Sequence, residues 1–313
     1  MLPIAAAAPP AIAQQYPTRP VRLIVPTTPG GSVDTLARTI APKLAERWGH
    51  QVVVDNRSGA GGTIAAEFTA RSAPDGYTLM IGTIASLATN VSLQQKLSYD
   101  PLRDFAPVTL VATQNLVLTV HPSVPAKSVR ELVKLAKARP GQLAFASAGN
   151  GTGSHLSGEL FKQLAGVDVL HIPYKGVAPA LVDVIAGQVS MSFPSILTSL
   201  PQVQSGRLRA LAVSGAQRSA ALPELPTMME AGVKDYESAT WYGIVAPAAT
   251  PPEIVNKLHA EITAILRQPD TRDRIARDGA DPVGNTPQQF GAFMKSEIEK
   301  WRKVIRAAGI LPG

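Results

Sequence analysis

The chain has 313 residues, enough for about two domains, and no cysteine, which excludes disulfides, thiolate metal sites and cysteine nucleophiles. Hydrophobic residues make up 45% and charged residues 17% of the chain, a globular rather than disordered composition. The formal net charge of +7 is spread along the sequence without a dense basic block, so we expect no nucleic-acid partner.

The N-terminus resembles the end of a secretory signal peptide. Residues 2–13 form an apolar, uncharged run that ends in Ala11-Ile12-Ala13, a small-x-small triplet of the kind that precedes cleavage. The basic start of a signal is missing, so we interpret residues 1–13 as a signal-peptide remnant; a disordered Ala/Pro tail is the alternative. No later segment reaches the ~18 apolar residues of a membrane span. We therefore expect a soluble, exported, periplasmic protein.

Strands and helices alternate from residue 21. Strands are predicted at 21–25, 51–54 and 77–81, with a helix after the loop 26–32 and another from the glycine-rich segment 59–62 through about residue 72. Ser32 is the expected N-cap of the first helix, and Asp34 falls in its first turn. Pro42 predicts a kink in that helix. This alternation is typical of βαβ units and a parallel sheet.

A second run repeats the pattern. A helix is expected after Ser128, and the following strands and helices are predicted at 143–147, 154–164, 167–172, 177–186, 189–193 and 209–214, with a short helix after Ser195. The apolar stretches 116–120 and 241–246 look like connectors, and helices near 254–265 and 288–308 would return to the first unit. We predict a two-lobed α/β protein, each lobe a mostly parallel sheet flanked by helices. Lobe 1 is 14–117 plus 245–313, and lobe 2 is 118–244.

Each run contains a strand, a glycine-rich loop and a helix start, at residues 26–32 and 147–154. Backbone N–H groups and hydroxyls beside the positive end of a helix form an anion site, and ligands of open α/β sheets bind beyond the carboxyl ends of the strands. If the lobes face each other, both loops point into one cleft. The alternative is that they are ordinary helix caps. Neither loop fits a phosphate-binding or dinucleotide motif, so we expect no cofactor.

The sequence contains few combinations of residues that could carry out catalysis. Ser154 and His155 suggest a hydrolase, but there is no G-x-S-x-G elbow, and adjacent residues point apart. His155 and Glu159 share a helical face without H-E-x-x-H, so a polar pair is favoured over a metal site. His171, in an apolar strand, is interpreted as a hydrogen-bonded core residue. We expect no enzymatic activity and no bound metal.

Other candidates lie at strand ends. Thr83 and Ser86 follow the third strand, Tyr174 and Gly176 follow a strand of the second run, and Ser195 precedes a short helix. Trp241 and its neighbour Tyr242 could close over the apolar body of a ligand, or could pack in the core or between the lobes.

At these residues the sequence resembles the extracytoplasmic receptors of tripartite tricarboxylate transporters, the Bug family. The stretches that carry the resemblance run in order along the chain: 16–17, 21–25, 29–34, 52–57, 59–62, 74–79, 147–156, 173–176 and 225–227. The resemblance implies a type II periplasmic binding protein that closes like a flytrap on a carboxylate held by backbone amides, hydroxyls and water. It also implies one large and one small membrane subunit as partners, and we expect a monomer.

The predicted ligand-binding residues come from both lobes and the return connector. Asp34 is interpreted as a loop organiser, because its charge would repel a carboxylate. The complete set is Thr27, Thr28, Gly30, Gly31, Ser32, Asp34, Thr83, Ser86, Ser147, Ala148, Gly149, Thr152, Gly153, Ser154, His155, Tyr174, Gly176, Ser195 and Trp241. The leading hypothesis is ligand capture for uptake; the alternatives are a secreted hydrolase using Ser154 and His155, and a ligand-sensing module for a signalling system.

Overall fold

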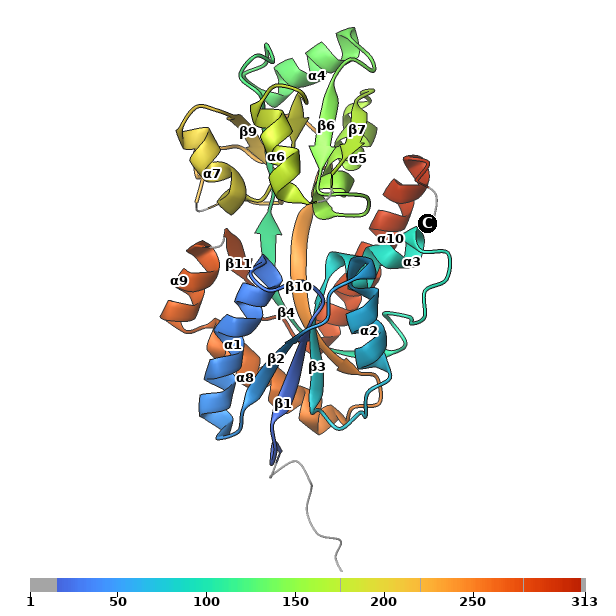
Figure 1. The fold of residues 1–313 in the computed structure, drawn as a ribbon, viewed down its shortest axis with the longest axis vertical. Coiled ribbons are helices and arrows are strands. Elements are labelled where there is room, and N and C mark those ends of the chain that lie inside the picture. Colours follow the sequence, from blue (N-terminus) through green and yellow to red (C-terminus); the bar gives the residue numbers. More distant parts are fainter. Residues whose placement is uncertain (1–15, 175, 220, 278, 311–313) are drawn as a thin grey trace, which may run out of the picture.

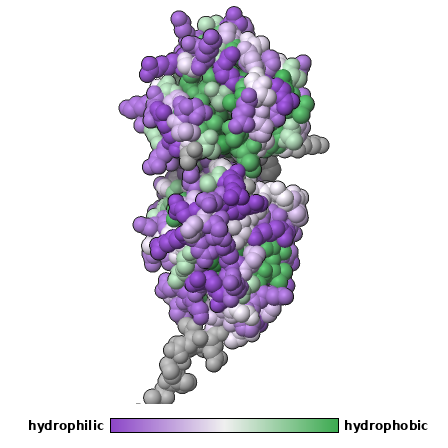
Figure 2. All heavy atoms as spheres, turned by 90° about the vertical axis from the view of Figure 1, so that its left-hand side faces the viewer, coloured by the Kyte–Doolittle hydropathy of each residue, from purple (hydrophilic) through white to green (hydrophobic). Residues whose placement is uncertain are grey.

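The computed structural model describes residues 16–174, 176–219, 221–277 and 279–310, so the expected signal-peptide remnant, residues 1–13, lies outside the described residues. Two β-sheets, each flanked by helices, form two lobes stacked along the long axis of the molecule (Figure 1). A space-filling view from the side shows a waist between them (Figure 2). In the described parts of the chain, no helix combines the length and the apolar character needed to cross a membrane.

The sheet of the first lobe has six strands in the order β11-β4-β10-β3-β1-β2. Its strands are β1 (Val21–Val25), β2 (Val52–Asn56), β3 (Thr78–Thr83), β4 (Phe105–Asn115), β10 (Ala239–Pro247) and β11 (Ala280–Pro282). β1 pairs in parallel with β2 and β3, whereas β10 runs antiparallel to β3 and β4. The sheet is therefore mixed rather than mostly parallel. The reason is that β4 leads out to the second lobe while β10 returns from it.

The second lobe contains a five-stranded sheet in the order β7-β6-β8-β5-β9, which is also mixed. Its strands are β5 (Val117–Val120), β6 (Ala144–Ser147), β7 (Leu170–Pro173), β8 (Met191–Ser192) and β9 (Arg209–Val213). β6 is parallel to β7 and β8, and β5 is antiparallel to β8 and β9. The parallel half of each sheet holds the βαβ units that the sequence predicted.

The chain crosses between the lobes twice, at Leu116 and near Ser238. The crossings are tied together through Ser214, whose Oγ accepts from the Leu116 N–H at 2.9 Å and whose carbonyl accepts from the Ser238 N–H at 2.8 Å. Residues 239–244, expected at the end of lobe 2, instead begin β10 and pair in the six-stranded sheet. Both predicted connectors are thus strands.

Helices cover both faces of the first sheet (Figure 1). Those on one face are α1 (Ser32–Trp48), α8 (Pro252–Leu266) and α9 (Pro269–Arg277), and those on the other are α2 (Thr63–Ala70), α3 (Asn90–Leu93) and α10 (Pro287–Ala307). Alternate residues of a strand face opposite sides, so Leu23 and Val25 pack toward α1 and α8, whereas Ile24 packs toward α2. The C-terminal helices complete the first lobe.

Helix α1 is a single α-helix that includes Pro42, as expected. Its N-cap differs from the prediction: it is Gly31 rather than Ser32, which is the first helical residue. Gly31 has the extended backbone typical of an N-cap (φ −82°, ψ 170°) but has no side chain to accept from the first turn.

In the second lobe, α5 (Gly153–Ala165) and α4 (Val129–Ala138) lie on one side of the sheet and α6 (Val177–Ile185) on the other, while α7 (Ile196–Gln204) covers β5. Neighbouring residues of β6 divide between the two sides. Phe145 packs with the α5 core and Ala146 with the α6 core. The carboxyl ends of β6, β7 and β8 therefore lead directly into the loops before α5, α6 and α7.

Candidate functional site

The first loop joins β1 to α1 and is organised by a buried carboxylate. Asp34 is 3% exposed, and its Oδ2 accepts from the Gly30 N–H at 2.9 Å while its Oδ1 accepts from Asn56 Nδ2 at 2.9 Å. Arg38 Nε donates to the same carboxylate. Burial opposes ionisation, but the hydrogen bonds from Arg38, Gly30 and Asn56 outweigh it, so the pKa of Asp34 lies below its usual value. Asp34 thus fixes the conformation of the first loop from its buried side, as expected of a loop organiser.

The end of α1 remains available to an anion. No side chain caps this helix, and Thr28, Gly30 and Gly31 are exposed while Ser32 is half-buried. Thr27 Oγ1 is buried without a hydrogen-bond partner and lies 4.0 Å from where a Cβ on Gly31 would be. A free hydroxyl beside uncapped N–H groups, at the end of a helix that carries about half a positive charge, is a donor set for a carboxylate.

Two further loops of the first lobe converge on this one. Thr83 and Ser86 form a closed turn at the end of β3, in which the Thr83 N–H donates to Ser86 Oγ at 3.0 Å, and Ser86 is fully buried. A glycine-rich turn, η2 (Ala60–Gly62), packs between them: a Cβ on Gly62 would lie 3.1 Å from both Pro26 Cβ and Ser86 Cβ. Because Gly62 also has φ +89°, only glycine suits this position.

The second loop joins β6 to α5 and satisfies most of its own polar groups. Ser147 Oγ accepts from the Gly149 N–H at 3.1 Å, and Ser154 Oγ accepts from the Ala148 N–H at 3.0 Å. Thr152 donates to the Gly149 carbonyl and caps α5 by accepting from the His155 N–H. The loop therefore holds its shape through neutral hydrogen bonds. Ser154 is engaged in this network rather than exposed as a nucleophile.

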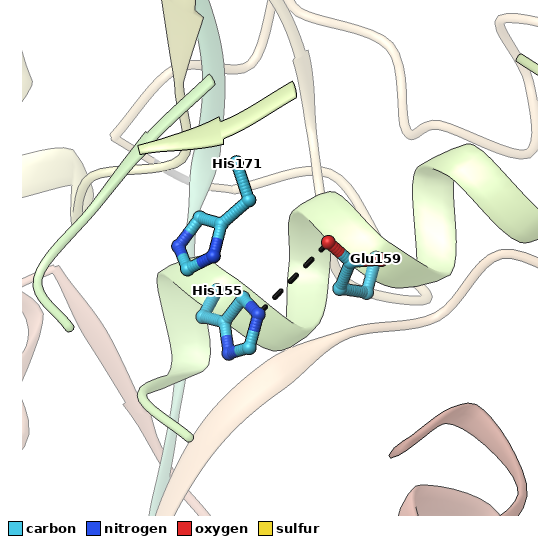
Figure 3. A group of neighbouring side chains, drawn as sticks. All are labelled: His155, Glu159 and His171. Atoms are coloured by element: carbon cyan, nitrogen blue, oxygen red, sulfur yellow. Dashed lines mark ion pairs between the residues drawn. The ribbon is translucent and has the colours of Figure 1, made fainter. Parts of the chain in front are cut away.

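Two stacked histidines lie behind the second loop (Figure 3). The rings of His155 and His171 are 3.9 Å apart and inclined by 16°, and Phe145 continues the stack at 4.8 Å from His171. His171 Nε2 lies 2.6 Å from Ser147 Oγ, and His155 Nδ1 accepts from the Gly151 N–H at 3.0 Å. Burial, followed by the positive charges nearby, lowers the pKa of His155 to about 3 and that of His171 to about 4. Both rings are neutral at pH 7 and support the loop.

These histidines and Glu159 lie close enough together to suggest a metal site, but their chemistry does not fit one. The Gly151 N–H donates to Nδ1 of His155, so the ring proton is on Nε2, the atom that faces Glu159 Oε1 at 3.9 Å. A metal ion would have to displace that proton. Glu159 is already paired with the Lys162 ammonium at 2.9 Å. The cluster is a structural support within the described residues.

Helix α6 supplies a second uncapped N-terminus. Its N-cap is Gly176, with φ +121° and no side-chain hydrogen bond, and the Gly176 N–H donates to the Ala148 carbonyl at 3.1 Å. Tyr174 lies beside the second loop because its N–H donates to the Ser147 carbonyl at 3.0 Å, and its hydroxyl donates to Asp183 of α6 at 2.6 Å. Ser195, in contrast, caps α7 by accepting from the Thr198 N–H. Between these two helices, the N-terminus of α7 is therefore capped by a side chain, whereas that of α6 is not.

The two lobes meet at the second loop. A Cβ on Gly151 would lie 2.4 Å from Leu93 Cδ1 of α3, so the loop approaches the first lobe at glycine. A Cβ on Gly153 would similarly lie 2.5 Å from Thr240 Oγ1. A hollow of about 300 Å³ opens between the lobes here. Its lining comes from η2, from the π-helical turn η3 (Ala85–Thr89), from α3 and the following Gln94, from residues 150–152, and from Ile310.

Of the ten described residues that line this hollow, only Thr152 belongs to the predicted set, and the polar residues Asn90 and Gln94 were missed. Asn90 is 5% exposed and donates to the Gly61 carbonyl at 3.0 Å, and Gln94 donates to Thr63 Oγ1 at 2.7 Å. Together they hold η2 against α3. The sequence contained one signal for this region: the glycine run 59–62 follows β2 in the same way as the first loop follows β1.

Trp241 lies in the core rather than at the ligand-facing surface. It is 1% exposed, packs edge-on against Phe290 and Phe293, and donates from Nε1 to Glu297 at 2.8 Å. Trp301 donates to the same carboxylate at 2.8 Å. Of the two roles considered for Trp241, the structure supports core packing: it joins β10 to α10.

Two α/β lobes crossed twice by the chain, with loops at the carboxyl ends of their strands facing the waist, define the class of two-lobed solute-binding receptors. The sequence matches the family described as tripartite tricarboxylate transporter family receptor over residues 36–310. BugT of Bordetella pertussis is 40% identical over 301 residues, covering 96% of this chain and 92% of BugT. The chain belongs to this receptor family, whose members are solute receptors rather than enzymes.

Solved structures agree with this assignment. The structure of R. palustris Rpa4515 with adipate matches with a TM-score of 0.83 and 42% identity, covering 95% of this chain and all of that chain. The periplasmic binding protein BugD matches with a TM-score of 0.79 and 35% identity over 95% of this chain and 100% of BugD. MatC from Rhodopseudomonas palustris with bound malate has a TM-score of 0.78 and 34% identity, covering 93% and 100%. The predicted family and the two-lobed fold are confirmed.

Proposed function

We propose that this protein captures a small carboxylate-bearing ligand between its lobes, in the periplasm, and delivers it to the large and small membrane subunits of a tripartite tricarboxylate-type transporter. The observation that carries the proposal is the pair of uncapped helix ends, α1 from one lobe and α6 from the other. Each favours negative charge. A ligand with carboxylate groups can engage both, and the two relatives with adipate and malate bind acids of that kind.

Closure of the lobes would follow from the same arrangement. A ligand that touches both helix ends stabilises the conformation in which they are close, and it shifts the equilibrium by its differential affinity. The crossings at Leu116 and Ser238, joined through Ser214, are the segments about which the lobes would rotate. The closed monomer would then present both lobes to the membrane subunits.

Binding without turnover is the decisive test. We expect isothermal titration calorimetry against a panel of mono- and dicarboxylates to give saturable binding of at least one acid, with the acid recovered unchanged. Native mass spectrometry of freshly purified protein would identify retained ligand. The Ser154→Ala variant serves as the control for hydrolysis, because a receptor retains no turnover to lose. Turnover that disappears in this variant, or a panel in which no carboxylate binds, would contradict the proposal.

A further inference from the structure

A small hollow in the second lobe lies directly beside the uncapped end of α6. It is enclosed by the carboxyl ends of β6 and β8 and by the first turns of α6. Its described lining includes Ala146, Ser147, Ser154, Ser192 and Phe193, together with residues of α6. Val177 is the first helical residue after Gly176, and Ala148 belongs to the second loop. A carboxylate at this helix end therefore has its neighbouring carbon atoms next to the hollow.

The hydroxyl groups around the hollow already have partners inside the protein. Ser147 Oγ is bonded to His171 Nε2 at 2.6 Å and to the Gly149 N–H. Ser154 Oγ accepts from the Ala148 N–H and lies 3.1 Å from Thr152 Oγ1. Ser192 Oγ lies 3.0 Å from Thr119 Oγ1.

The other side chains of the lining are hydrocarbon. Methyl and methylene groups come from Ala146, Val177, Ala180 and Leu181, and an aromatic ring comes from Phe193. Among the described residues that line the hollow, none has a charged side chain. A polar ligand group that entered would lose its water, and the only polar side chains it would meet among the described lining residues are serines that already have partners.

We propose that this hollow is an apolar subsite that selects carboxylates with an unsubstituted aliphatic body over their hydroxylated counterparts. The inference rests on the proposed function, since it concerns the ligand of the same cleft. The cavity volume of about 10 Å³ corresponds to about one water-sized group. A methylene or methyl group fits that space, whereas an aromatic ring does not. The ligand class is thus a saturated aliphatic acid with CH₂ next to the carboxylate.

The size of the expected preference follows from the cost of an unpaired hydroxyl. A hydroxyl left without a partner in an apolar pocket weakens binding by about 10- to 100-fold. The loss of affinity is largest for dicarboxylates that carry a hydroxyl next to each of their two carboxylates. In such an acid, either orientation of the ligand places a hydroxyl in the subsite.

Matched acids test the inference on the complete chain. Calorimetry would compare succinate with the stereoisomers of tartrate, and adipate with galactarate, pairs of equal carbon number that differ in hydroxyl groups. We expect the unsubstituted acid to bind at least tenfold more tightly in every pair that shows binding. Equal affinities, or tighter binding of the hydroxylated acid, would overturn this inference while leaving the proposed function intact. Failure of every acid to bind would overturn the proposed function itself.

Two substitutions on α6 test whether the hollow itself causes the preference. Val177→Ser places a hydroxyl at the edge of the hollow, and we expect it to reduce the affinity ratio of unsubstituted to hydroxylated acid at least threefold. Val182→Ser is the matched control, because Val182 is 61% exposed on α6 and does not line the hollow. Thermal melts confirm that both variants fold. An unchanged preference in Val177→Ser, or an equal change in both variants, would show that the hollow is not the source of selectivity.

Discussion

The two loops that face the waist hold their shapes by different chemistry. The first loop is shaped by an ionised carboxylate, Asp34, with a guanidinium behind it. The second loop is held by hydroxyls and two neutral, stacked imidazoles. Their helix ends differ as well: Gly31 has a backbone that any residue can adopt, whereas Gly176 has φ +121°. A receptor can therefore present similar donor sets to a ligand on supports that respond differently to charge and pH.

The two loops are expected to differ most in how acid affects the groups that support them. His155 and His171 have pKa values of about 3 and about 4 in the folded protein and about 6.5 in the unfolded chain. The unfolded chain therefore binds protons that the folded protein rejects. The stability that the two groups provide is complete above pH 6.5, and it is lost progressively as the pH drops toward 4.

Urea denaturation between pH 7.5 and 4 measures this loss. The double variant His155→Asn, His171→Gln, which cannot take up a proton at these positions, should give a flatter profile than the unmodified chain. A profile equally steep in the variant would show that other groups cause the acid sensitivity. The depressed pKa of Asp34 predicts that its contribution persists through this range and is lost only as the pH falls below its unfolded value of about 4.

Removing the carboxylate of the first loop is expected to have the next largest effect. Asp34→Ala removes the carboxylate that accepts from the Gly30 N–H, Asn56 Nδ2 and Arg38 Nε, and should lower the free energy of unfolding by about 3 kcal/mol. Asp34→Asn keeps the size and one acceptor oxygen, so an intermediate loss is expected. Urea denaturation at pH 7 checks both variants. If Asp34→Asn were as stable as the unmodified chain, the charge would not contribute to the support of this loop.

Capping the first helix should produce the smallest change in stability and a clear change in binding. Gly31→Asp introduces an acceptor at the N-cap and should stabilise the fold by about 0.5–1 kcal/mol. The same side chain occupies the N–H groups proposed for the ligand, so carboxylate affinity should fall about tenfold. Gly31→Ala, which adds a methyl group with no atom closer than 3.9 Å, is the control and should bind normally. Thermal melts and calorimetry give the two readouts, and normal binding by Gly31→Asp would exclude this helix end as a ligand contact.

Much of the scaffold could be predicted from the sequence. The strands of the βαβ units and the stripe Ile254, Leu258, Ile262 and Ile265 follow simple hydrophobic periods, and the stripe residues are all buried. The antiparallel strand β4 was missed because Phe105–Asn115 is buried at most positions and contains no clear alternation. The strand pairing that makes each sheet mixed depends on contacts distant in sequence, which local patterns do not encode.

The candidate site shows the same division between local and distant information. Glycine runs and hydroxyl residues at strand ends pointed to both loops, and Asp34 lies as a loop organiser should. The sequence could not reveal that Ser195 is engaged as a cap, that Trp241 is drawn into the core by Glu297, or that Asn90 braces η2. The roles of Trp241 and Asn90 depend on partners distant in the sequence, and the role of Ser195 depends on its side-chain rotamer.

The buried carboxylate of Glu297 also bears on the order in which the molecule assembles. It joins Trp241 of the return strand to Trp301 of α10, so the core of the first lobe is complete only when α10 has been synthesised. The second sheet, in contrast, comes from one uninterrupted stretch, Val117–Val213. During synthesis from the N-terminus, all strands of that sheet are available before either β10 or α10 exists. The lobe in the middle of the chain can therefore fold first, and the lobe that contains both ends closes around its own last helix.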